Sequence, residues 1–183
     1  MSDLVVFTYE QEDRAGQALT SLAGLKQENV QKALIGIEDA AVVVKNANGR
    51  VKLRQTLESA VKGRNVASGG LWGMLIGFLF GGPLFGALLG MGLSGLLGRR
   101  IDIGIDNAFI RGVSDDLTPG ESALFLLVKD TPVETVAEAL REHGGTLYHT
   151  SFSDEAAEAF RQAAASDELK EAVADLNEVS PTA

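Results

Sequence analysis

The chain contains no cysteine, only two histidines and a single tryptophan among its 183 residues. Without cysteine, disulfide bonds, thiolate metal sites and a cysteine nucleophile are all excluded. The two histidines, His143 and His149, do not have the i, i+4 spacing of a metal-binding pair on a helix. We therefore expect neither of them to bind a metal, and the sequence predicts no cofactor.

Basic residues are also scarce, because 16 Lys and Arg stand against 25 Asp and Glu and give a formal net charge of −9. Proteins that bind nucleic acid need a basic surface to neutralise phosphates. We therefore expect no nucleic-acid partner. The same acidic balance limits any broad attraction of the whole chain to anionic lipid.

Motifs of the common enzyme classes are missing as well, since the chain has no Walker-type lysine and no Gly-x-Ser-x-Gly motif. Gly90-Met91-Gly92 with Gly95 has the spacing of a dinucleotide-binding motif, but it lies inside an apolar run and follows no strand. Asp102 and Asp106 could hold Mg²⁺, but with arginines nearby they are better explained as solvated ion pairs. The sequence therefore predicts a protein that is not an enzyme.

Charge is absent altogether from Asn65 to Gly98, a stretch of 34 residues. A single helix of that length would be about 51 Å long, whereas the hydrocarbon core of a bilayer is about 30 Å thick. Gly81-Gly82-Pro83 is a turn signal, and Pro83 would interrupt a continuous helix. We therefore predict a helical hairpin with one arm over 66–80 and the other over 84–98.

Glycines recur at four-residue intervals through this uncharged segment. A glycine inside a solvated helix costs about 1 kcal/mol relative to alanine, so close backbone packing must compensate. Small residues four apart lie on one helix face and allow two helices to approach closely in lipid. The predicted packing residues of this glycine zipper are Gly69, Gly73, Gly77, Gly81, Gly82, Gly86, Gly90 and Gly98.

Basic residues flank the uncharged segment on both sides: Lys62 and Arg64 before it, and Arg99 and Arg100 after it. Positive residues stay on the cytoplasmic side of a membrane, so both ends of the hairpin are expected there. The N-terminus also lacks the basic region and cleavage site of a secretory signal. The expected location is the cytoplasmic face of the inner membrane, with a soluble cytoplasmic assembly as the alternative.

The rest of the chain alternates between strand and helix patterns in the order β-α-β-β, uncharged segment, α, β-α-β, α. Its two most apolar runs, Leu4–Phe7 and Ala123–Val128, open the two β-α-β units and are expected to be central strands. We therefore predict an α+β fold, a ferredoxin-like split β-α-β sheet interrupted by the glycine-zipper hairpin and followed by a C-terminal helix. The predicted parts are the first half of the sheet domain with a β-hairpin, the uncharged hairpin, the second half and an acidic helical tail, at 1–62, 63–100, 101–152 and 153–183.

Several segments resemble one bacterial family. They are Asp39–Lys45, Val51–Thr56, Leu71–Gly77, Phe80–Leu84, Gly104–Asp106, Phe109–Ile110 and Gly120–Phe125. Together they are similar, over about Val5 to Ser153, to the bacterial membrane proteins of the domain of unknown function twelve-sixty-nine family. The resemblance implies membrane association and carries over no reaction and no catalytic residue.

Three functions remain open from the sequence. The first is a membrane-associated homo-oligomer whose hairpins pack in or on the bilayer and whose sheet domain is a cytosolic scaffold or regulator. The second is a soluble homo-oligomer whose hairpins form a shared apolar core, because so large an apolar surface cannot stay exposed on a monomer. The third is a small-molecule-binding domain, which would need a polar pocket that the sequence does not locate.

Overall fold

The computed structural model describes residues 2–24, 36–56, 70–80 and 105–153. The chain divides into two compact units. The first comprises Met1–Val66 and Gly104–Ser153, and the second comprises Ala67–Ile103 and Asp154–Ala183. The predicted second arm of the hairpin (84–98) and the C-terminal helix after Ser153 lie outside the described residues, and the predicted domain boundaries stay a prediction.

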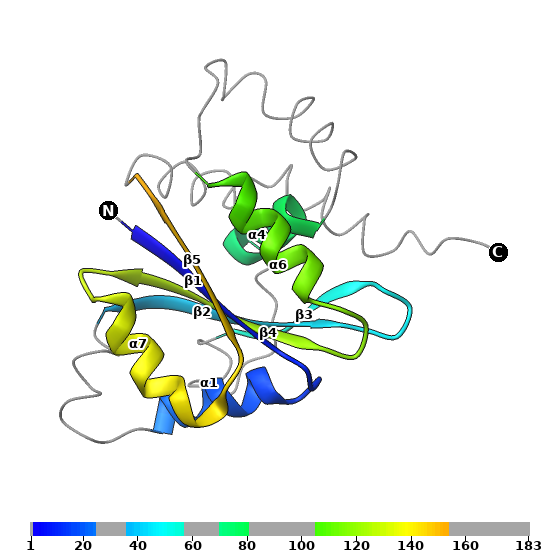
Figure 1. Ribbon diagram of the computed structural model, residues 1–183, viewed down its shortest axis with the longest axis horizontal. Helices are drawn as coiled ribbons and strands as arrows, with labels where there is room; N and C mark the ends of the chain where they lie inside the picture. Colours follow the sequence, from blue (N-terminus) through cyan, green and yellow to red (C-terminus); the bar gives the residue numbers. More distant parts are fainter. Residues whose placement is uncertain (1, 25–35, 57–69, 81–104, 154–183) are drawn as a thin grey trace, which may run out of the picture. The chain divides into compact units, whose positions relative to one another are not determined.

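The first unit contains one five-stranded sheet in which every neighbouring pair is antiparallel (Figure 1). The spatial order of the strands is β3-β2-β4-β1-β5. This sheet, together with the helices around it, confirms the α+β class expected from the sequence. The strands are β1 (Ser2–Tyr9), β2 (Ile37–Lys45), β3 (Val51–Thr56), β4 (Ser122–Lys129) and β5 (Thr146–Phe152).

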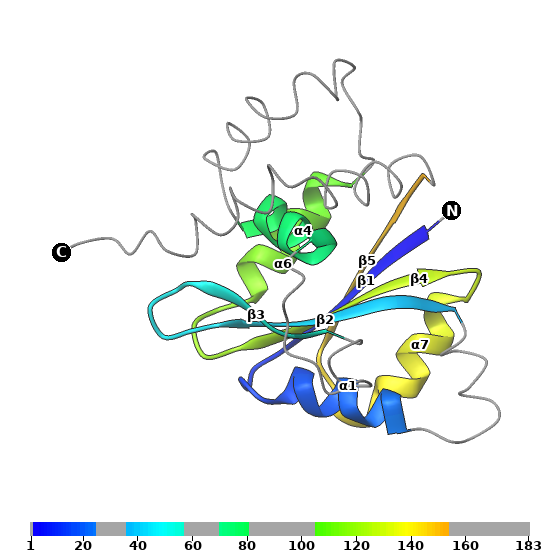
Figure 2. The ribbon, with the colours of Figure 1, turned by 180° about the vertical axis from the view of Figure 1, so that it is seen from behind.

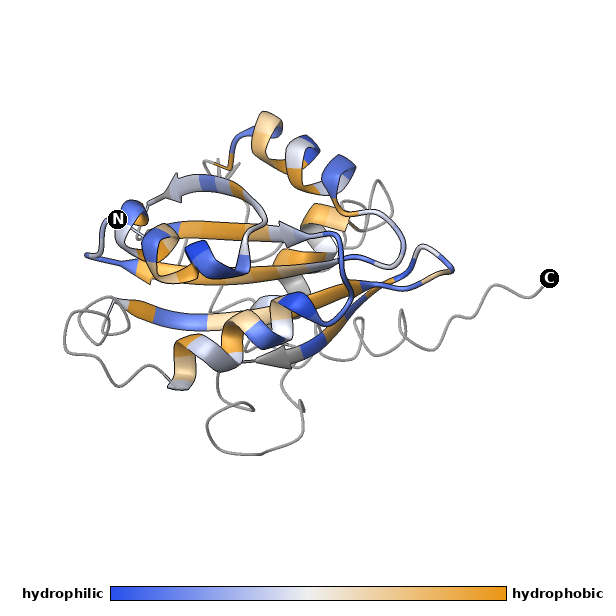
Figure 3. Cartoon of the chain, turned by 60° about the horizontal axis from the view of Figure 1, so that its bottom comes forward, coloured by the Kyte–Doolittle hydropathy of each residue, from blue (hydrophilic) through white to orange (hydrophobic). Residues whose placement is uncertain are grey.

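The two most apolar runs outside the uncharged segment form β1 and β4, and these two strands pair with each other inside the sheet. Their register runs from Ser2 opposite Lys129 to Tyr9 opposite Ser122. Strands whose two faces are both buried read as continuous apolar runs instead of alternating patterns. Figure 3 shows this composition as hydrophobic colour along the inner strands.

Helices cover both faces of this sheet. Helices α1 (Arg14–Gly24) and α7 (Val133–Leu140) contact each other and lie on one face (Figure 2). Helix α6 (Asn107–Asp116) contacts β1 and β5 from the other side. A short 3-10 helix, η1 (Arg141–His143), continues from α7 toward β5.

The core between the sheet and the pair α1 and α7 is built mainly from aliphatic side chains, with Tyr9 at its edge. Leu19 of α1 and Leu140 of α7 are both fully buried and belong to the same hydrophobic cluster as Val5, Leu124 and Leu126 of the strands. Alternate residues of the same strands point to the opposite face, where Leu4, Val6 and Phe125 are also completely inaccessible. Burial on both faces explains why β1 and β4 form from segments without polar alternation.

Apolar residues at Ile101, Ile105, Ala108, Phe109 and Ile110 predict an amphipathic helix over residues 101–113, but the observed helix begins later than this pattern indicates. Residue Asp106 has a β-region backbone (φ −65°, ψ 134°) and is the N-cap of α6. Its Oδ1 accepts a hydrogen bond from the backbone N–H of Ala108 at 3.0 Å. Because an N-cap residue is itself non-helical, no helix can run through this position, and α6 starts at Asn107.

The start of α7 also differs from the prediction. The run Thr131-Pro132-Val133-Glu134 predicts a helix start with Thr131 as the N-cap, Pro132 as the first helical residue and Glu134 at the third helical position. In the structure Pro132 is the N-cap, it makes no side-chain capping bond, and Val133 is the first helical residue. Asp130, directly before this run, takes a positive φ of 55°. Thr131 and Pro132 therefore belong to the turn, and the helix begins one residue later than the sequence predicts.

Candidate functional site

Two of the eight predicted packing glycines, Gly73 and Gly77, lie on described residues, in helix α4 (Gly70–Phe80). This helix carries no charged residue and falls within the predicted first arm. The other predicted site residues lie outside the described part of the chain: Gly69, Gly81, Gly82, Gly86, Gly90, Gly98, the turn residue Pro83, and the flanking residues Lys62, Arg64, Arg99 and Arg100.

Helix α4 has a buried stripe that is separate from its glycine positions. Trp72, Leu75, Ile76 and Leu79 are all less than a tenth exposed, and their spacing places them on one helix face. Gly77 is partly exposed and lies about 100° from Ile76 around the helix axis. Within the described residues, no helix has both the length and the apolar character needed to cross a membrane.

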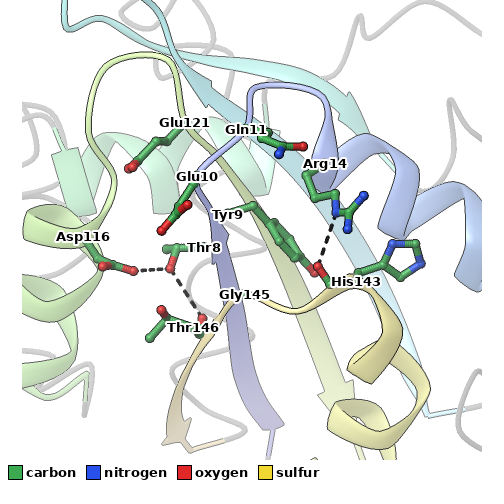
Figure 4. Close-up of a pocket in the computed structure, with 10 residues that line it drawn as sticks. All are labelled: Thr8, Tyr9, Glu10, Gln11, Arg14, Asp116, Glu121, His143, Gly145 and Thr146. Atoms are coloured by element: carbon green, nitrogen blue, oxygen red, sulfur yellow. Dashed lines mark hydrogen bonds between the residues drawn. The ribbon is translucent and has the colours of Figure 1, made fainter.

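A polar pocket of about 370 Å³ lies in the first unit, where β1 ends (Figure 4). The antiparallel pairing creates it, since the last residues of β1 lie beside the first residues of both β4 and β5. Its walls therefore come from segments more than 100 residues apart in sequence. They are Thr8, Tyr9, Glu10, Gln11, Arg14, Asp116, Glu121, His143, Gly145 and Thr146.

One half of the pocket is acidic. The Thr8 hydroxyl donates a hydrogen bond to Asp116 Oδ2 at the end of α6 and lies 3.5 Å from the backbone oxygen of Thr146. Glu121 accepts a hydrogen bond at Oε2 from a backbone N–H of its own turn. Glu10 adds a third carboxylate at this end of β1, so negative charge exceeds positive charge around the pocket as a whole.

Asp116 also influences a tyrosine just beyond the pocket. The pKa of Tyr148 is raised above its usual value of 10.0, first by burial and then by the charge of Asp116 and a hydrogen bond to it. The Asp116 carboxylate is therefore held by internal donors. Gly112 permits this arrangement, because a Cβ there would lie 2.7 Å from the Tyr148 ring.

The other half of the pocket carries the positive charge. Arg14, at the start of α1, donates from Nε to the backbone oxygen of His143 at 3.3 Å. The Tyr9 side chain points from β1 toward these two residues (Figure 4). Tyr9 is only 4% exposed, and its hydroxyl has no hydrogen-bond partner among the residues that the structure describes.

The electrostatics of Tyr9 follow from this burial. Burial raises the pKa of the Tyr9 phenol well above its usual value, and the positive charge of Arg14 opposes part of that rise. The phenol is therefore protonated at neutral pH and can donate a hydrogen bond. A buried hydroxyl without a partner is unusual in a native fold and calls for an explanation.

Gly145 sets how closely the start of β5 approaches β1. Its φ is +94°, and a Cβ there would lie 2.7 Å from the backbone oxygen of Thr8 and 2.8 Å from the Tyr9 ring. A side chain is thus excluded both by the backbone conformation and by space. Gly145 itself forms part of the pocket wall.

A second polar cluster joins β1 and β5 near their other ends. Asp3 Oδ1 accepts a hydrogen bond from Ser151 Oγ at 2.5 Å and lies 3.1 Å from His149 Nε2, and Ser151 Oγ lies 3.4 Å from the same nitrogen. In a Ser-His-Asp triad the carboxylate and the hydroxyl contact different ring nitrogens. The cluster therefore lacks the geometry of a proton relay.

The candidate metal-ligating residues of the sequence are dispersed. Asp106 caps α6, His143 lines the pocket, and His149 belongs to the Asp3 cluster. Within residues 2–24, 36–56, 70–80 and 105–153, no group of three or more His, Asp or Glu side chains could hold a metal ion.

The pocket residues Tyr9 and Arg14 were missed by sequence reasoning. Two signals could have pointed to them: a tyrosine at the end of the most N-terminal apolar strand and a polar run from Glu10 directly after it. Binding residues are often found on loops that leave a rigid sheet. Neither signal identifies the partner segments, because those follow more than 100 residues later.

Comparison with known proteins gives a family without an assigned activity. Neither the curated proteins nor the solved structures include a match to the chain. A family described as Protein of unknown function (DUF1269) matches residues 66–165. The match begins later than the resemblance predicted near residue 5 and extends beyond residue 153. The matched region covers more than half of the chain, and the chain therefore belongs to the family described as Protein of unknown function (DUF1269).

Proposed function

We propose that the protein is a non-enzymatic homo-oligomer that associates through its uncharged segment, Asn65–Gly98, in or on a membrane. The observation that carries this proposal is the combination of 34 uncharged residues with glycines at four-residue spacing. Such a segment has too much apolar surface to remain exposed on a monomer. Its partners are other copies of the chain and the lipid bilayer.

Helix α4 supports the packing mode. The segment Gly70–Phe80 is helical despite its glycines, so Gly73 and Gly77 stand one turn apart on one face. The four buried side chains lie on a different stripe, and Gly77 is partly exposed. A partner helix could therefore approach the glycine face without displacing the buried stripe.

The strand order supports the finer fold assignment, a ferredoxin-like sheet. The first β-α-β unit contains β1 and β2, and β4 lies between them. The second unit contains β4 and β5, and β1 lies between them. Such interleaving is what a split β-α-β arrangement requires. In our proposal this sheet domain is the cytosolic scaffold or regulatory part, with the hairpin inserted after β3.

The leucine side chains of the uncharged segment can be shielded from water either by lipid or by other copies of the chain. The basic residues Lys62, Arg64, Arg99 and Arg100 favour a bilayer, with the chain at the cytoplasmic face of the inner membrane. The alternative is a soluble cytoplasmic assembly in which the hairpins of several copies form a shared core. Both versions require self-association through the same segment.

Fractionation and particle mass distinguish these versions. After cell lysis without detergent, the membrane version places the protein in the membrane pellet, released by detergent and not by salt or alkali. A discrete large particle in the supernatant would instead support the soluble assembly. A monomer in the supernatant would contradict both.

The packing mode is tested by a matched pair of substitutions at Gly77. Gly77→Leu places a bulky side chain on the predicted contact face and should reduce the oligomer to smaller species. Gly77→Ala keeps a small residue and should preserve the assembly, since alanine also allows close helix approach. Particle mass from light scattering, in detergent if needed, gives the result, and equal masses for the two variants would refute the zipper.

A further inference from the structure

We propose that β5 is a second self-association surface, at which the strand pairs antiparallel with β5 of another copy of the chain. A two-fold axis through His149 would join the two five-stranded sheets into one continuous sheet. This surface belongs to the first unit and is separate from the uncharged segment, so it does not depend on the proposed function.

The position of β5 in the sheet is the first reason. β5 lies at one end of the sheet, beside β1, and no described strand pairs with its outer side. All seven of its residues, Thr146–Phe152, pair with β1 in one register without a bulge. An uninterrupted edge of this kind presents a row of backbone N–H and C=O groups to which a further strand can be added.

The opposite edge of the sheet is protected, whereas the β5 edge is not. Lys52 and Arg54 of β3 are exposed, and the pairing of β2 with β3 is interrupted by a register shift between Val42 and Val43. Charged side chains and bulges are the features that keep an edge strand from pairing with another chain. β5 has neither feature, because it contains no Asp, Glu, Lys or Arg and no irregularity in its register.

An exposed apolar side chain lies on this same strand. In the described part of the chain, Leu147 is the one large apolar side chain that is exposed, at 42%. Strand alternation places Leu147, His149 and Ser151 on one face of the sheet. In the proposed pair, Leu147 lies opposite Ser151 of the partner subunit and diagonal to the partner's His149, so that pairing shields it from water.

The charge at this edge indicates another copy of the chain as the occupant. The net charge of −9 makes most surfaces of two copies repel each other, but two β5 strands bring no carboxylate opposite another. The two His149 rings would face each other. Each keeps an Asp3 carboxylate 3.1 Å from its Nε2, and this carboxylate compensates any positive charge on the ring.

The register follows from the length of the strand. A two-fold axis through His149, the central residue, lets all seven residues of both strands pair, whereas any other two-fold centre leaves residues at both ends unpaired. The same register sets Tyr148 opposite Thr150 of the partner subunit. Aromatic and β-branched residues stabilise a sheet when they are opposite each other, and the two-fold axis forms this pair twice.

Cysteine cross-linking in the full-length protein tests the arrangement, because the chain has no cysteine of its own. Opposite residues of an antiparallel pair have Cα atoms about 4.5–5.5 Å apart, within the range of about 4.4–6.8 Å that a disulfide spans. We therefore expect His149→Cys to form a covalent dimer under mild oxidation, seen on a non-reducing gel and lost on reduction. The His149 side chain is 40% exposed, so this variant should fold.

Leu147→Cys is the matched control on the same strand. Its two copies would lie four residues apart along the paired strands, about 13 Å at 3.3 Å per residue, which is too far for a disulfide. Co-expressed Leu147→Cys and Ser151→Cys chains should instead cross-link to each other, because these positions are opposite in the proposed register. Lys52→Cys, on the protected β3 edge, should give no dimer.

Two further changes separate this surface from the uncharged segment. Leu147→Lys gives β5 the kind of charge that protects β3 and should abolish the His149→Cys dimer, whereas Leu147→Met should preserve it. Gly77→Leu is expected to disrupt association through the uncharged segment and should also leave the His149→Cys dimer in place. Loss of the dimer in the Gly77→Leu protein would show that β5 is not an independent surface.

Other outcomes would overturn the proposal as well. They are a monomeric His149→Cys protein, equal cross-linking of Leu147→Cys or Lys52→Cys, and a His149→Cys dimer that survives Leu147→Lys. A monomeric His149→Cys protein whose thiol also resists a maleimide reagent would show that another segment of the same chain covers the edge. If Gly77→Leu lowers the particle mass while His149→Cys stays monomeric, only the β5 pairing is refuted and the proposed function stands.

Discussion

Gly145→Ala should destabilise the first unit considerably more than the same substitution at Gly120. The two glycines have nearly identical φ angles of +94° and +93°. They differ in the space around them. A Cβ on Gly120 would meet no atom within 4 Å, whereas a Cβ on Gly145 would lie 2.7 Å from the backbone oxygen of Thr8.

The expected magnitudes follow from these two terms. A residue with a Cβ at positive φ costs about 1–2 kcal/mol, and both variants carry this cost. Overpacking costs a further 1–3 kcal/mol or so, and only Gly145→Ala carries it. The clash cannot relax easily, because Thr8 is held in register opposite Thr146 in the β1–β5 pair. We therefore expect a loss of about 2–5 kcal/mol for Gly145→Ala and about 1–2 kcal/mol for Gly120→Ala.

Urea unfolding followed by far-ultraviolet circular dichroism measures both free energies of unfolding. The dependence of the free energy on urea should be the same for both variants, so that the midpoints report stability alone. Equal destabilisation by the two substitutions would refute the close approach of Gly145 to the end of β1. It would also remove this wall from the pocket.

Two further predictions concern Tyr9 and the cap of α6. Burial raises the pKa of Tyr9 in the folded protein, so the unfolded chain loses the phenol proton first as the pH rises above about 10. Above that pH, Tyr9 therefore lowers the free energy of unfolding by up to about 1.4 kcal/mol per pH unit, and below pH 10 it has no such effect. Tyr9→Phe should flatten the alkaline loss of stability in thermal unfolding between pH 9 and pH 12, and an unchanged alkaline slope would contradict the burial of an ionisable hydroxyl. Asp106→Ala should cost about 1 kcal/mol by removing the N-cap of α6, whereas Asp106→Asn should keep the cap. Urea midpoints compare these two variants, and equal midpoints would contradict the capping role.

Much of the sheet could be predicted from local pattern. The apolar runs at Leu4–Phe7 and Ala123–Val128 are strands because β-branched and aromatic residues without alternation suit a strand that is buried on both faces. The helix starts were less predictable. Asp106 and Pro132 are both N-caps, because the position at which a helix starts depends on the path of the strand or loop that precedes it.

The candidate sites differ in how far sequence could reach them. The glycine spacing of the uncharged segment is local information, and only its residues Gly73 and Gly77 lie within the described helix. The pocket is not local at all. Tyr9 reads as an ordinary strand residue until the fold places Arg14 and His143 beside it.

Composition and local pattern are enough to establish the absence of thiol chemistry, the acidic balance, the long uncharged segment and the positions of the buried strands. These properties depend on composition and on short-range periodicity, which can be read within each segment without knowing what the segment contacts. The pairing of the strands in the folded protein establishes which strand ends meet, and hence that Thr8, Asp116 and Gly145 share one pocket. Pairing across more than 100 residues brings them together, and no local pattern encodes it.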